Sequence, residues 1–596
     1  MRSETSLSAS PVMTEVISRE QLEESGVRTV GEALALLPGL WIDRGIAGTT
    51  GITIQGLGPR YSLVLVNGAR QIGRTDGYLD LDRFGTADIE QLEIVRGPSS
   101  AVYGADALGG VVNIITRKPR IGVALDVVTR IDGRLAADAG LRLALGRDGL
   151  SGAVTSEYRA GPAIRRGDPS AVATTLDSYA DRQVAGRISD QRNGRWQLDG
   201  AADYLYRDLQ GVDASQTGVV FDRRNLVETA SAQAAAQYTT EQTALRVTGD
   251  LSLYYDQYRR DQRMSNEMDE NQKTKENLIE GSSQVVREIG MHRVLAGAEV
   301  LRESLDSERL LAPGFRVRGA VYTQDEWRMG QDEPLLAVAT VRLDYDAQFG
   351  IHATPRLAGR WQANSRLALR GNIGTGYRAP DFKELLLHFE NPGVGYVVDG
   401  NLDLKPETSR NVQGGAEWQV MPWLSMSASG FYNDLHDLID IVAEPDDGSG
   451  TLRFGYGNVG RARTVGVESS ATVMHGRAGL DLGYALTRAR DLDGEHPLAG
   501  VPQHRFTATA HWRDTTEGLD AFAEVVFTGH RPYYLSDDPR AATPSPRRLE
   551  IRARIAKRFR GRYGGFVGVD NLLNEGDASL NRIPPRTLHA GLEIHL

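Results

Sequence analysis

The chain contains no cysteine and no long apolar run, and each absence removes a class of protein. Without cysteine there is no disulfide scaffold and no cysteine-ligated zinc or iron–sulfur site. No stretch approaches the roughly 18 apolar residues of a membrane-spanning helix, so none is predicted. The net charge of −10 argues against a general nucleic-acid-binding protein. The N-terminal segment lacks the apolar core of a signal peptide, so we expect none in this chain.

Glycine and alternating apolar residues are abundant instead. Glycine accounts for 66 of 596 residues, about 11% against a typical share of roughly 7%. From about residue 120 onward, apolar and polar residues alternate, as in 196–206, where Trp196, Leu198 and Tyr204 share one face and Asp199 lies on the other. Because successive side chains of a strand point to opposite faces, this pattern predicts strands with one apolar and one polar face.

Such alternation fits either a soluble β-sandwich or a membrane barrel, and three features favour the barrel. The alternating stretches are long, about 9–12 residues, which suits a tilted crossing of a bilayer. Aromatic residues lie near their ends, and ionised residues on the polar faces would face a lumen. The polar segments 261–277 and 444–451 are predicted to be exposed loops. The last segment, 586–596, alternates up to Leu596 and is predicted to be the closing strand.

The first 120 residues follow a different pattern and predict a small α+β domain. Residues 18–39 suit one or two short helices, and short strands are expected at 51–56, 61–70 and 89–97. The pair Asn67-Gly68 is a hairpin turn signal. The domain ends in a glycine-rich stretch, IVRGPSSAVYGADALGGVVNIITRKP.

This glycine-rich stretch could be a phosphate-binding loop or a structural turn. Between Gly104 and Gly110 it lacks the Lys-Ser/Thr pair that contacts phosphate and magnesium, and no G-x-G-x-x-G opens a helix. Nucleotide binding is therefore not expected. The glycines are expected to allow close backbone packing before the strand at 111–116.

Several long segments, in the same order, resemble the TonB-dependent outer-membrane receptors. They are residues 16–40, 89–119, 375–386, 400–418, 456–469 and 569–575, together with the terminal strand. The resemblance implies a mainly β fold: a transmembrane antiparallel barrel of 22 strands with a small N-terminal α+β plug domain in its lumen. We expect an N-terminal tail at 1–13, the plug at 14–120 and the barrel at 121–596.

The resemblance also implies a transport function in the outer membrane of a Gram-negative cell. The expected partners are periplasmic TonB through the N-terminal segment, the barrel-assembly machinery, outer-membrane lipid and a small metal-chelate ligand, with no nucleic acid. The protein is expected to be a monomer and not an enzyme, without a cofactor, because no nucleophile–base pair or metal triad stands out in the sequence. A passive porin is the alternative from another class, although a passive pore would have no reason to carry a plug.

Family positions suggest how the plug is held in the barrel. Arg96 matches a plug arginine that pairs with barrel glutamates, for which Glu407 and Glu468 are the candidates. The family's second plug arginine lies in an I-R-G motif, but here the motif is I-Q-G with Gln55, so the tether is weaker by one charge or another arginine substitutes. A degenerate TonB box is expected at Glu4, Thr5, Ser6, Leu7 and Ser8. Leu596 stands where the family favours phenylalanine, which would make recognition by the assembly machinery less efficient.

The ligand is left open by the sequence, with a ferric siderophore expected before haem or cobalamin. Haem receptors of the family place a histidine between two mid-barrel motifs, and His388 lies between YRAP and GNLDL. With Tyr377 and Arg378 of YRAP, it is a candidate for ligand binding. Against haem, residues 1–120 contain no histidine, so the plug offers no second axial ligand.

Overall fold

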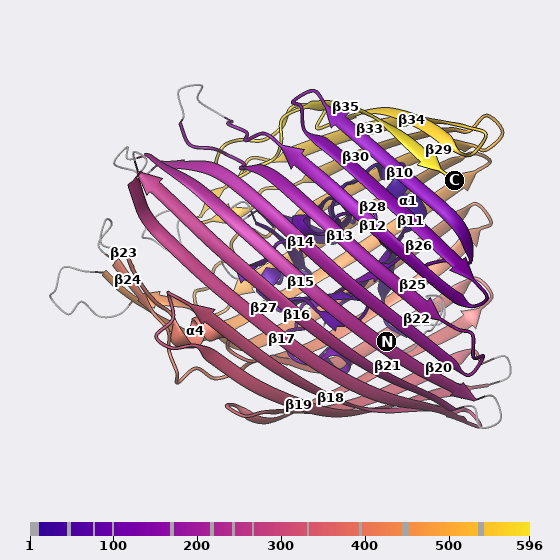
Figure 1. Ribbon diagram of the computed structural model, residues 1–596. Helices are drawn as coiled ribbons and strands as arrows, with labels where there is room; N and C mark the ends of the chain where they lie inside the picture. The colour runs from indigo at the N-terminus through magenta and orange to yellow at the C-terminus, as the bar shows by residue number, and fades with distance from the viewer. Residues whose placement is uncertain are drawn as a thin grey trace.

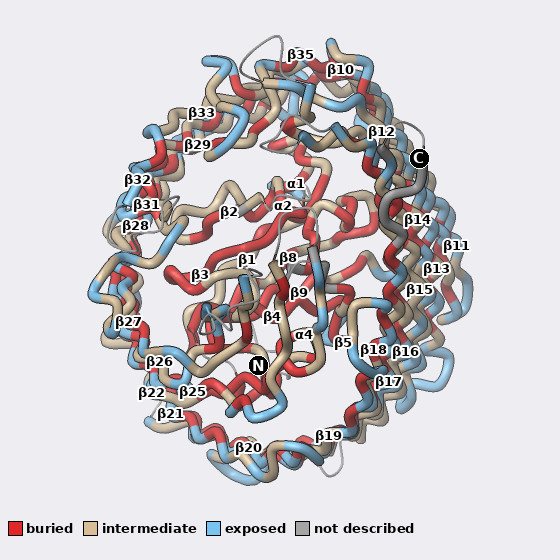
Figure 2. Tube along the Cα trace, turned by 90° about the vertical axis from the view of Figure 1, so that its left-hand side faces the viewer, coloured by how far each residue is buried: buried red, intermediate tan, exposed pale blue. Residues whose placement is uncertain are grey.

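A computed structural model of the chain shows a closed β-barrel with a small domain inside it (Figures 1 and 2). The structure describes residues 11–44, 49–75, 78–97, 100–166, 172–214, 220–240, 245–264, 267–330, 333–391, 396–443, 452–534 and 542–596. None of the helices in these ranges combines the length and hydrophobicity needed to span a membrane.

The barrel is a closed antiparallel sheet of 22 strands, which confirms the predicted fold class. The strands are β10 (Gly122–Asp132), β11 (Ala137–Arg147), β12 (Leu150–Gly161), β13 (Ser178–Asp190), β14 (Trp196–Ala214), β15 (Val220–Thr240), β16 (Leu245–Met264), β17 (Glu267–Ile289), β18 (His292–Ser307), β19 (Gly314–Met329), β20 (Leu335–Asp346), β21 (Gly350–Asn364), β22 (Leu367–Arg378), β25 (Glu407–Met421), β26 (Leu424–Ala443), β27 (Leu452–His475), β28 (Ala478–Asp491), β29 (His504–Asp514), β30 (Leu519–Thr528), β33 (Arg548–Phe559), β34 (Tyr563–Asp570) and β35 (Thr587–His595). The last strand closes the barrel by pairing with the first, from Asp126↔His595 to Asp132↔His589.

The two ends of the barrel differ. One end, the loop end, carries the long connections, including helix α4 (Phe382–Leu386) and the hairpin of β23 (His388–Asn391) and β24 (Tyr396–Asp399) (Figure 1, left). The loop end also carries the short pair β31 (Pro532–Tyr533) and β32 (Thr543–Pro544). The other end, the turn end, carries short connections and the C-terminus (Figure 1, right).

The predicted alternation between two faces is present in the barrel wall. Along β14, Trp196 and Tyr204 are exposed on the outside, while Leu205 and Arg207 are buried toward the lumen. An outer face of exposed apolar side chains suits contact with lipid, and a polar inner face suits contact with the plug.

The expected loop at 261–277 is wrong, because most of that segment is strand. β16 continues to Met264 and β17 begins at Glu267, and the pair Tyr258↔Thr274 lies within their ladder. Outside the bilayer, a strand can carry polar side chains on both faces. Its backbone N–H and C=O groups are still hydrogen-bonded to those of the neighbouring strands. The strands are therefore longer than expected, reaching 24 residues in β27. Residues 444–451 lie outside the described ranges.

The plug is built around a five-stranded sheet in the order β1-β8-β9-β4-β5. Its strands and helices are β1 (Thr14–Ser18), α1 (Arg19–Ser25), α2 (Val30–Leu34), β2 (Leu40–Arg44), β3 (Thr50–Ile54), η2 (Pro59–Tyr61), β4 (Ser62–Val66), β5 (Ala69–Arg70), β6 (Arg74–Thr75), β7 (Tyr78–Leu79), η3 (Leu81–Arg83), β8 (Ile89–Arg96), α3 (Ser100–Tyr103) and β9 (Gly110–Thr116). The first helix follows its sequence signals: Ser18 and Gln21 form a capping box, and Gly26 ends it in the left-handed conformation. Asn67 and Gly68, at φ 50° and 85°, form the predicted hairpin turn.

The glycine-rich stretch is a packing device, as predicted. A Cβ added at Gly110, which has φ 153°, would lie 2.5 Å from the carbonyl oxygen of Val95, so only glycine lets β9 pair so closely with β8. A Cβ at Gly104 would lie 2.7 Å from guanidinium nitrogens of both Arg70 and Arg342. Since Arg342 belongs to β20, the second glycine brings the plug backbone against the barrel wall.

Candidate functional site

The end of strand β8 carries a buried ion-pair cluster that joins plug to barrel. The Arg96 guanidinium lies 2.6 Å from the carboxylate of Glu468 on β27 and also contacts Glu15 of β1. Burial alone would lower the pKa of Arg96, but the two carboxylates outweigh it and raise that pKa above its ordinary value. The predicted partners Arg96 and Glu468 are thus brought together, with Glu15 as a third member that the sequence did not suggest.

Gln55, which stands where the family has its second plug arginine, belongs to a hydrogen-bond network of neutral side chains. Gln55 lies at the tip of the turn after β3, at φ 52°, and is buried. Its side-chain oxygen accepts a hydrogen bond of 3.3 Å from the Asn433 amide, which also donates to Thr464 at 2.8 Å. Asn411 in turn donates to the Asn433 oxygen. The barrel wall opposite Gln55 therefore offers amides and a hydroxyl in place of charges.

Within the described part of the plug, no arginine pairs with Glu407. Its carboxylate lies 2.7 Å from the Arg378 guanidinium, and both side chains belong to the barrel wall. Among the described residues of the plug, Glu407 is hydrogen-bonded by the Tyr61 hydroxyl, which donates to it at 3.4 Å. Burial, and then the Glu407 carboxylate, raise the pKa of Tyr61, so this hydroxyl stays protonated and acts as the donor.

Other charged side chains of the plug also pair with the barrel wall. Arg83 pairs with Asp256 at 3.0 Å, Asp88 with Arg187 at 2.9 Å, and Asp80 contacts Arg207. The sequence missed these pairs because alternation shows only that a side chain faces the lumen. Which plug residue it meets there depends on how the two domains dock.

The three candidate ligand-binding residues do not converge. Tyr377 and Arg378 are buried, the first stacked on the His352 ring at 4.5 Å, so in this structure a ligand at the surface does not reach them. Only His388, on β23, is exposed. Its Nδ1 lies 2.7 Å from Asp399 and its Nε2 lies 3.3 Å from Glu390. The hydrogen bond to Asp399 raises the pKa of His388 and favours the charged imidazolium.

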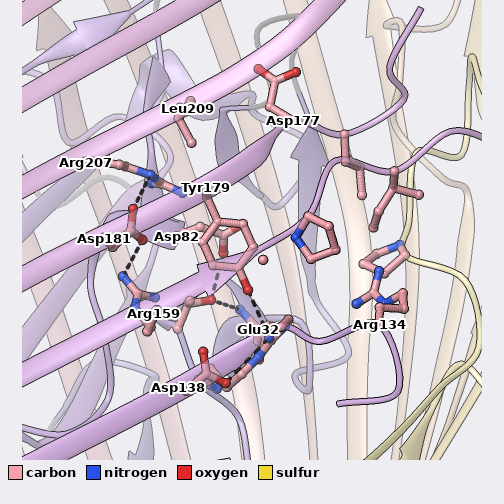
Figure 3. Close-up of a pocket in the computed structure, with 18 of the residues that line it drawn as sticks. Glu32, Asp82, Arg134, Asp138, Arg159, Asp177, Tyr179, Asp181, Arg207 and Leu209 are labelled. Carbon is pink, nitrogen blue, oxygen red and sulfur yellow. Dashed lines mark hydrogen bonds and ion pairs between the residues drawn. The ribbon is translucent and has the colours of Figure 1, made fainter. Parts of the chain in front are cut away.

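A charged cavity lies between the plug and the wall near the loop end (Figure 3). Asp181 bridges two arginines of neighbouring strands, Arg159 at 3.0 Å and Arg207 at 3.1 Å. On the plug side, Arg28 and Glu32 at the start of helix α2 line the same cavity. Cations and carboxylates are interleaved there, so its wall has no strong bias toward one sign of charge.

A second cavity lies nearer the turn end and shares two residues with the first. It runs between helix α1 and strands β10, β11, β33 and β35, and both cavities are lined by Arg28 and Asp138. Arg28 lies 2.6 Å from Glu32, 3.7 Å from Asp138 and 3.3 Å from the Tyr179 hydroxyl. The two cavities therefore lie in series along the wall, with the Arg28 cluster between them.

Two further observations concern metal and TonB. Within the described ranges, no group of three or more His, Asp or Glu side chains is placed to hold a metal ion. The predicted TonB box at residues 4–8 lies outside the described residues.

Comparisons with known proteins agree with this architecture. A family model described as the TonB-dependent receptor plug domain matches residues 6–111, and one described as the TonB-dependent receptor-like β-barrel matches residues 126–572. The iron-regulated outer membrane virulence protein of Vibrio cholerae is 29% identical over 87% of this chain and 82% of its own length. The siderophore receptor PirA of Acinetobacter baumannii has a TM-score of 0.82 at 18% identity, covering 98% of both chains. The ferric enterobactin receptor PfeA of Pseudomonas aeruginosa, in a mutant form, reaches 0.85 at 17% identity, covering 99% of both.

Proposed function

Because this chain belongs to the TonB-dependent receptor family of the outer membrane, we propose that it imports a ferric siderophore with energy supplied through TonB. Family and fold are those of transport receptors. The siderophore is supported by the names of its relatives: one is an iron-regulated outer-membrane protein, and the structural neighbours include siderophore receptors. We further propose that the assembly machinery inserts it into outer-membrane lipid as a monomer.

The observation that carries the proposal is a plug held inside a closed barrel by buried charges. The Arg96–Glu468 and Arg83–Asp256 pairs are both buried, and removing one partner of a buried pair is costly. A plug held in this way opens only when work is done on it. Coupling to an energy source therefore suits this interior better than passive diffusion does.

The first strand suggests how a pull would reach the tether. β1 pairs with β8 from Thr14↔Val95 to Ser18↔Gln91, so force on the chain before Thr14 loads this pairing first. Glu15 lies in β1 and shares Arg96 with Glu468. Separating β1 from β8 would take one of the two carboxylates away from Arg96. We infer that the tether weakens as β1 moves.

Haem has less support than a siderophore. An imidazole ligates iron through a neutral ring nitrogen, whereas both nitrogens of His388 face carboxylates that favour the charged ring. No feature of the described residues favours cobalamin specifically, and it stays an alternative.

The test is a ligand titration of the purified, detergent-solubilised chain, followed by tryptophan quenching. Ferric siderophores, haemin and cobalamin are titrated separately, and uptake is measured in cells with and without a protonophore. We expect saturable binding of a ferric siderophore and uptake that stops when the proton-motive force collapses. Binding of only haemin or only cobalamin would contradict the siderophore assignment, and uptake that survives the protonophore would contradict energy coupling.

A further inference from the structure

The charged cavity near the loop end and the second cavity nearer the turn end meet at one arginine of the plug. Their volumes are about 100 and 110 Å³, so each has room for several water molecules. Of the plug residues that the structure describes, Arg28 alone lines both cavities, and Asp138 faces it from β11. Figure 3 shows Glu32, Asp138 and Tyr179 gathered on one side of the first cavity.

Each cavity extends to partly exposed side chains at its own end of the barrel. At the loop end, the first cavity is lined by Pro162, which is exposed, and by Arg134, whose side chain is 23% exposed. At the turn end, the second cavity is lined by Glu23 and His595, whose side chains are 31% and 28% exposed. Water therefore reaches each cavity from a different end, and Arg28 lies where a continuous path along the wall would pass.

The Arg28 guanidinium spans the gap between plug and wall. On the plug side it lies 2.6 Å from Glu32 of α2. On the wall side its contacts are longer, at 3.3 Å to the Tyr179 hydroxyl of β13 and 3.7 Å to Asp138. One Asp138 oxygen is buried without a hydrogen-bond partner in the described part of the chain. The arginine is thus held more closely by the plug than by the wall, so a shift of α2 would carry it away from β11 and β13.

We propose that Arg28 seals a pathway for small ions along β10 to β13, closed in this structure and opened on the wall side when α2 moves. The inference goes beyond the proposed function, because it concerns inorganic ions and holds whichever ligand is carried. Charged side chains of both signs line the two cavities and can replace part of the hydration of a passing ion.

The charges at the seal also predict the selectivity of the opened pathway. Arg28 is the one ion-pair partner that the described residues offer to Glu32 and to Asp138. Without the guanidinium, two carboxylates face each other across the junction of the cavities. A pathway with carboxylates at its junction should pass cations in preference to anions.

The test is the ionic current through the purified full chain in a planar bilayer bathed in KCl, without ligand. For Arg28→Ala we expect about tenfold more current than for the wild type, since the positive charge that repels a passing K⁺ is gone. The reversal potential across a KCl gradient should show a preference for K⁺. The matched control is Arg19→Ala: Arg19 also pairs with a glutamate four residues later, Glu23 at 2.7 Å, and is equally buried, but it lines only the second cavity. This variant should keep the wild-type current.

Two further variants separate the seal from a loosened plug. Arg28→Ala/Glu32→Ala leaves no unpaired carboxylate on the plug, so it decides if Arg28→Ala does not fold, and it should conduct with a weaker preference for K⁺. Because the chain has no cysteine of its own, Arg28→Cys can be given back a positive charge by a thiol reagent that carries an ammonium group. This modification should return the current to the wild-type level. Heat-modifiable mobility on gels verifies that each barrel is folded.

The seal is ruled out if folded Arg28→Ala and the double variant conduct no more than the wild type, or if complete modification of Arg28→Cys leaves its current unchanged. It is equally ruled out if Arg19→Ala conducts as much as Arg28→Ala, because the current would then come from general loosening of the plug. Since the measurement contains no ligand, a failure to bind any siderophore would overturn the proposed cargo and leave this result unaffected.

Discussion

At the scale of single residues, the plug meets the barrel wall through charges that water hardly reaches. Arg96 and Glu468 are both buried, and the pair needs both members because an uncompensated buried charge is expensive. Gln55 stands where the family has a second plug arginine, and there the plug contacts the wall through a neutral side-chain amide instead of a charge. The contact between plug and wall therefore combines several ion pairs with neutral hydrogen bonds.

Replacing Glu468 by glutamine should loosen the plug. Glutamine keeps a hydrogen-bond acceptor and Arg96 keeps Glu15, so we expect a loss of about 2 kcal/mol, below the roughly 3–5 kcal/mol of a fully broken buried pair. Hydrogen exchange of the β1 and β8 amides should become faster. Asp148→Asn, in the exposed pair Arg147–Asp148, is the control and should leave exchange unchanged. Equal exchange in Glu468→Gln and wild type would show that the pair does not hold the plug.

The β23–β24 hairpin should respond to pH through His388. Its raised pKa, caused mainly by the hydrogen bond to Asp399, means that the charged ring is favoured in the folded hairpin. This stabilisation is fully present below the unfolded pKa of about 6.5 and is lost as pH rises through the higher folded pKa. Limited proteolysis between 388 and 399 should therefore be slower at pH 5.5 than at pH 8.5. His388→Gln should remove that difference, and a variant that keeps it would point to another titrating group.

The same histidine tests the haem alternative. Since its ring is held between two carboxylates, we expect His388→Ala to leave the affinity for haemin unchanged, as measured by the Soret absorbance on titration. A large loss of haemin affinity in this variant would restore haem as a candidate ligand.

At the scale of elements, the loop before strand β8 and strand β11 form one edge of the cavity near the turn end. An ideal Cβ at Gly140 on β11 would lie 3.3 Å from the Ala87 Cβ of the plug, and both residues line this cavity. Motion of the plug along β10 to β13 would have to separate these two positions.

A disulfide between these positions should block transport. The double variant Ala87→Cys/Gly140→Cys has a Cβ separation close to the roughly 3.5–4.5 Å of disulfides, and the chain has no other cysteine. When oxidised it should bind ligand normally but not take it up, and reduction should restore uptake. The single-cysteine variants serve as controls. Full uptake by the completely oxidised protein would show that the plug need not leave β11.

At the scale of the whole molecule, the plug distinguishes this barrel from a pore. A 22-stranded barrel without a filling would leave a wide aqueous lumen. Figure 2 shows the plug sheet and its helices inside the ring of strands, and the ion pairs described above join the two.

Conductance in a planar bilayer tests this difference. The full chain should show no large steady channel, whereas deletion of residues 14–120 should produce one, because the barrel strands begin only at Gly122. The deletion variant must first show the heat-modifiable mobility of a folded barrel. A large steady conductance from the full chain would favour the porin alternative.

Much of the barrel could be predicted because a strand's faces can be read from its own residues. Trp196 and Tyr204 alternate with polar neighbours, and this period of two predicted an outer face that the structure confirms. The plug's helix cap at Ser18 and its turn at Asn67-Gly68 are equally local signals. Strand ends were harder: the polar stretch 261–277 gave no sign of the pairing between β16 and β17, because that pairing depends on a neighbour.

The sequence by itself determined the fold class and the order of the two domains, since these rest on local periodicity and continuous motifs, and the family resemblance pointed to Arg96 as a tether candidate. Only the tertiary structure decided which charges meet across the lumen. It paired Glu407 with Arg378 of the wall, placed Trp41 among three arginines, and set the exposed His388 beside two carboxylates. The physical reason is clearest for Trp41, whose arginine neighbours come from segments far along the chain. Their meeting depends on the register of a closed barrel and on how the plug docks inside it, and neither is encoded in a short stretch of residues.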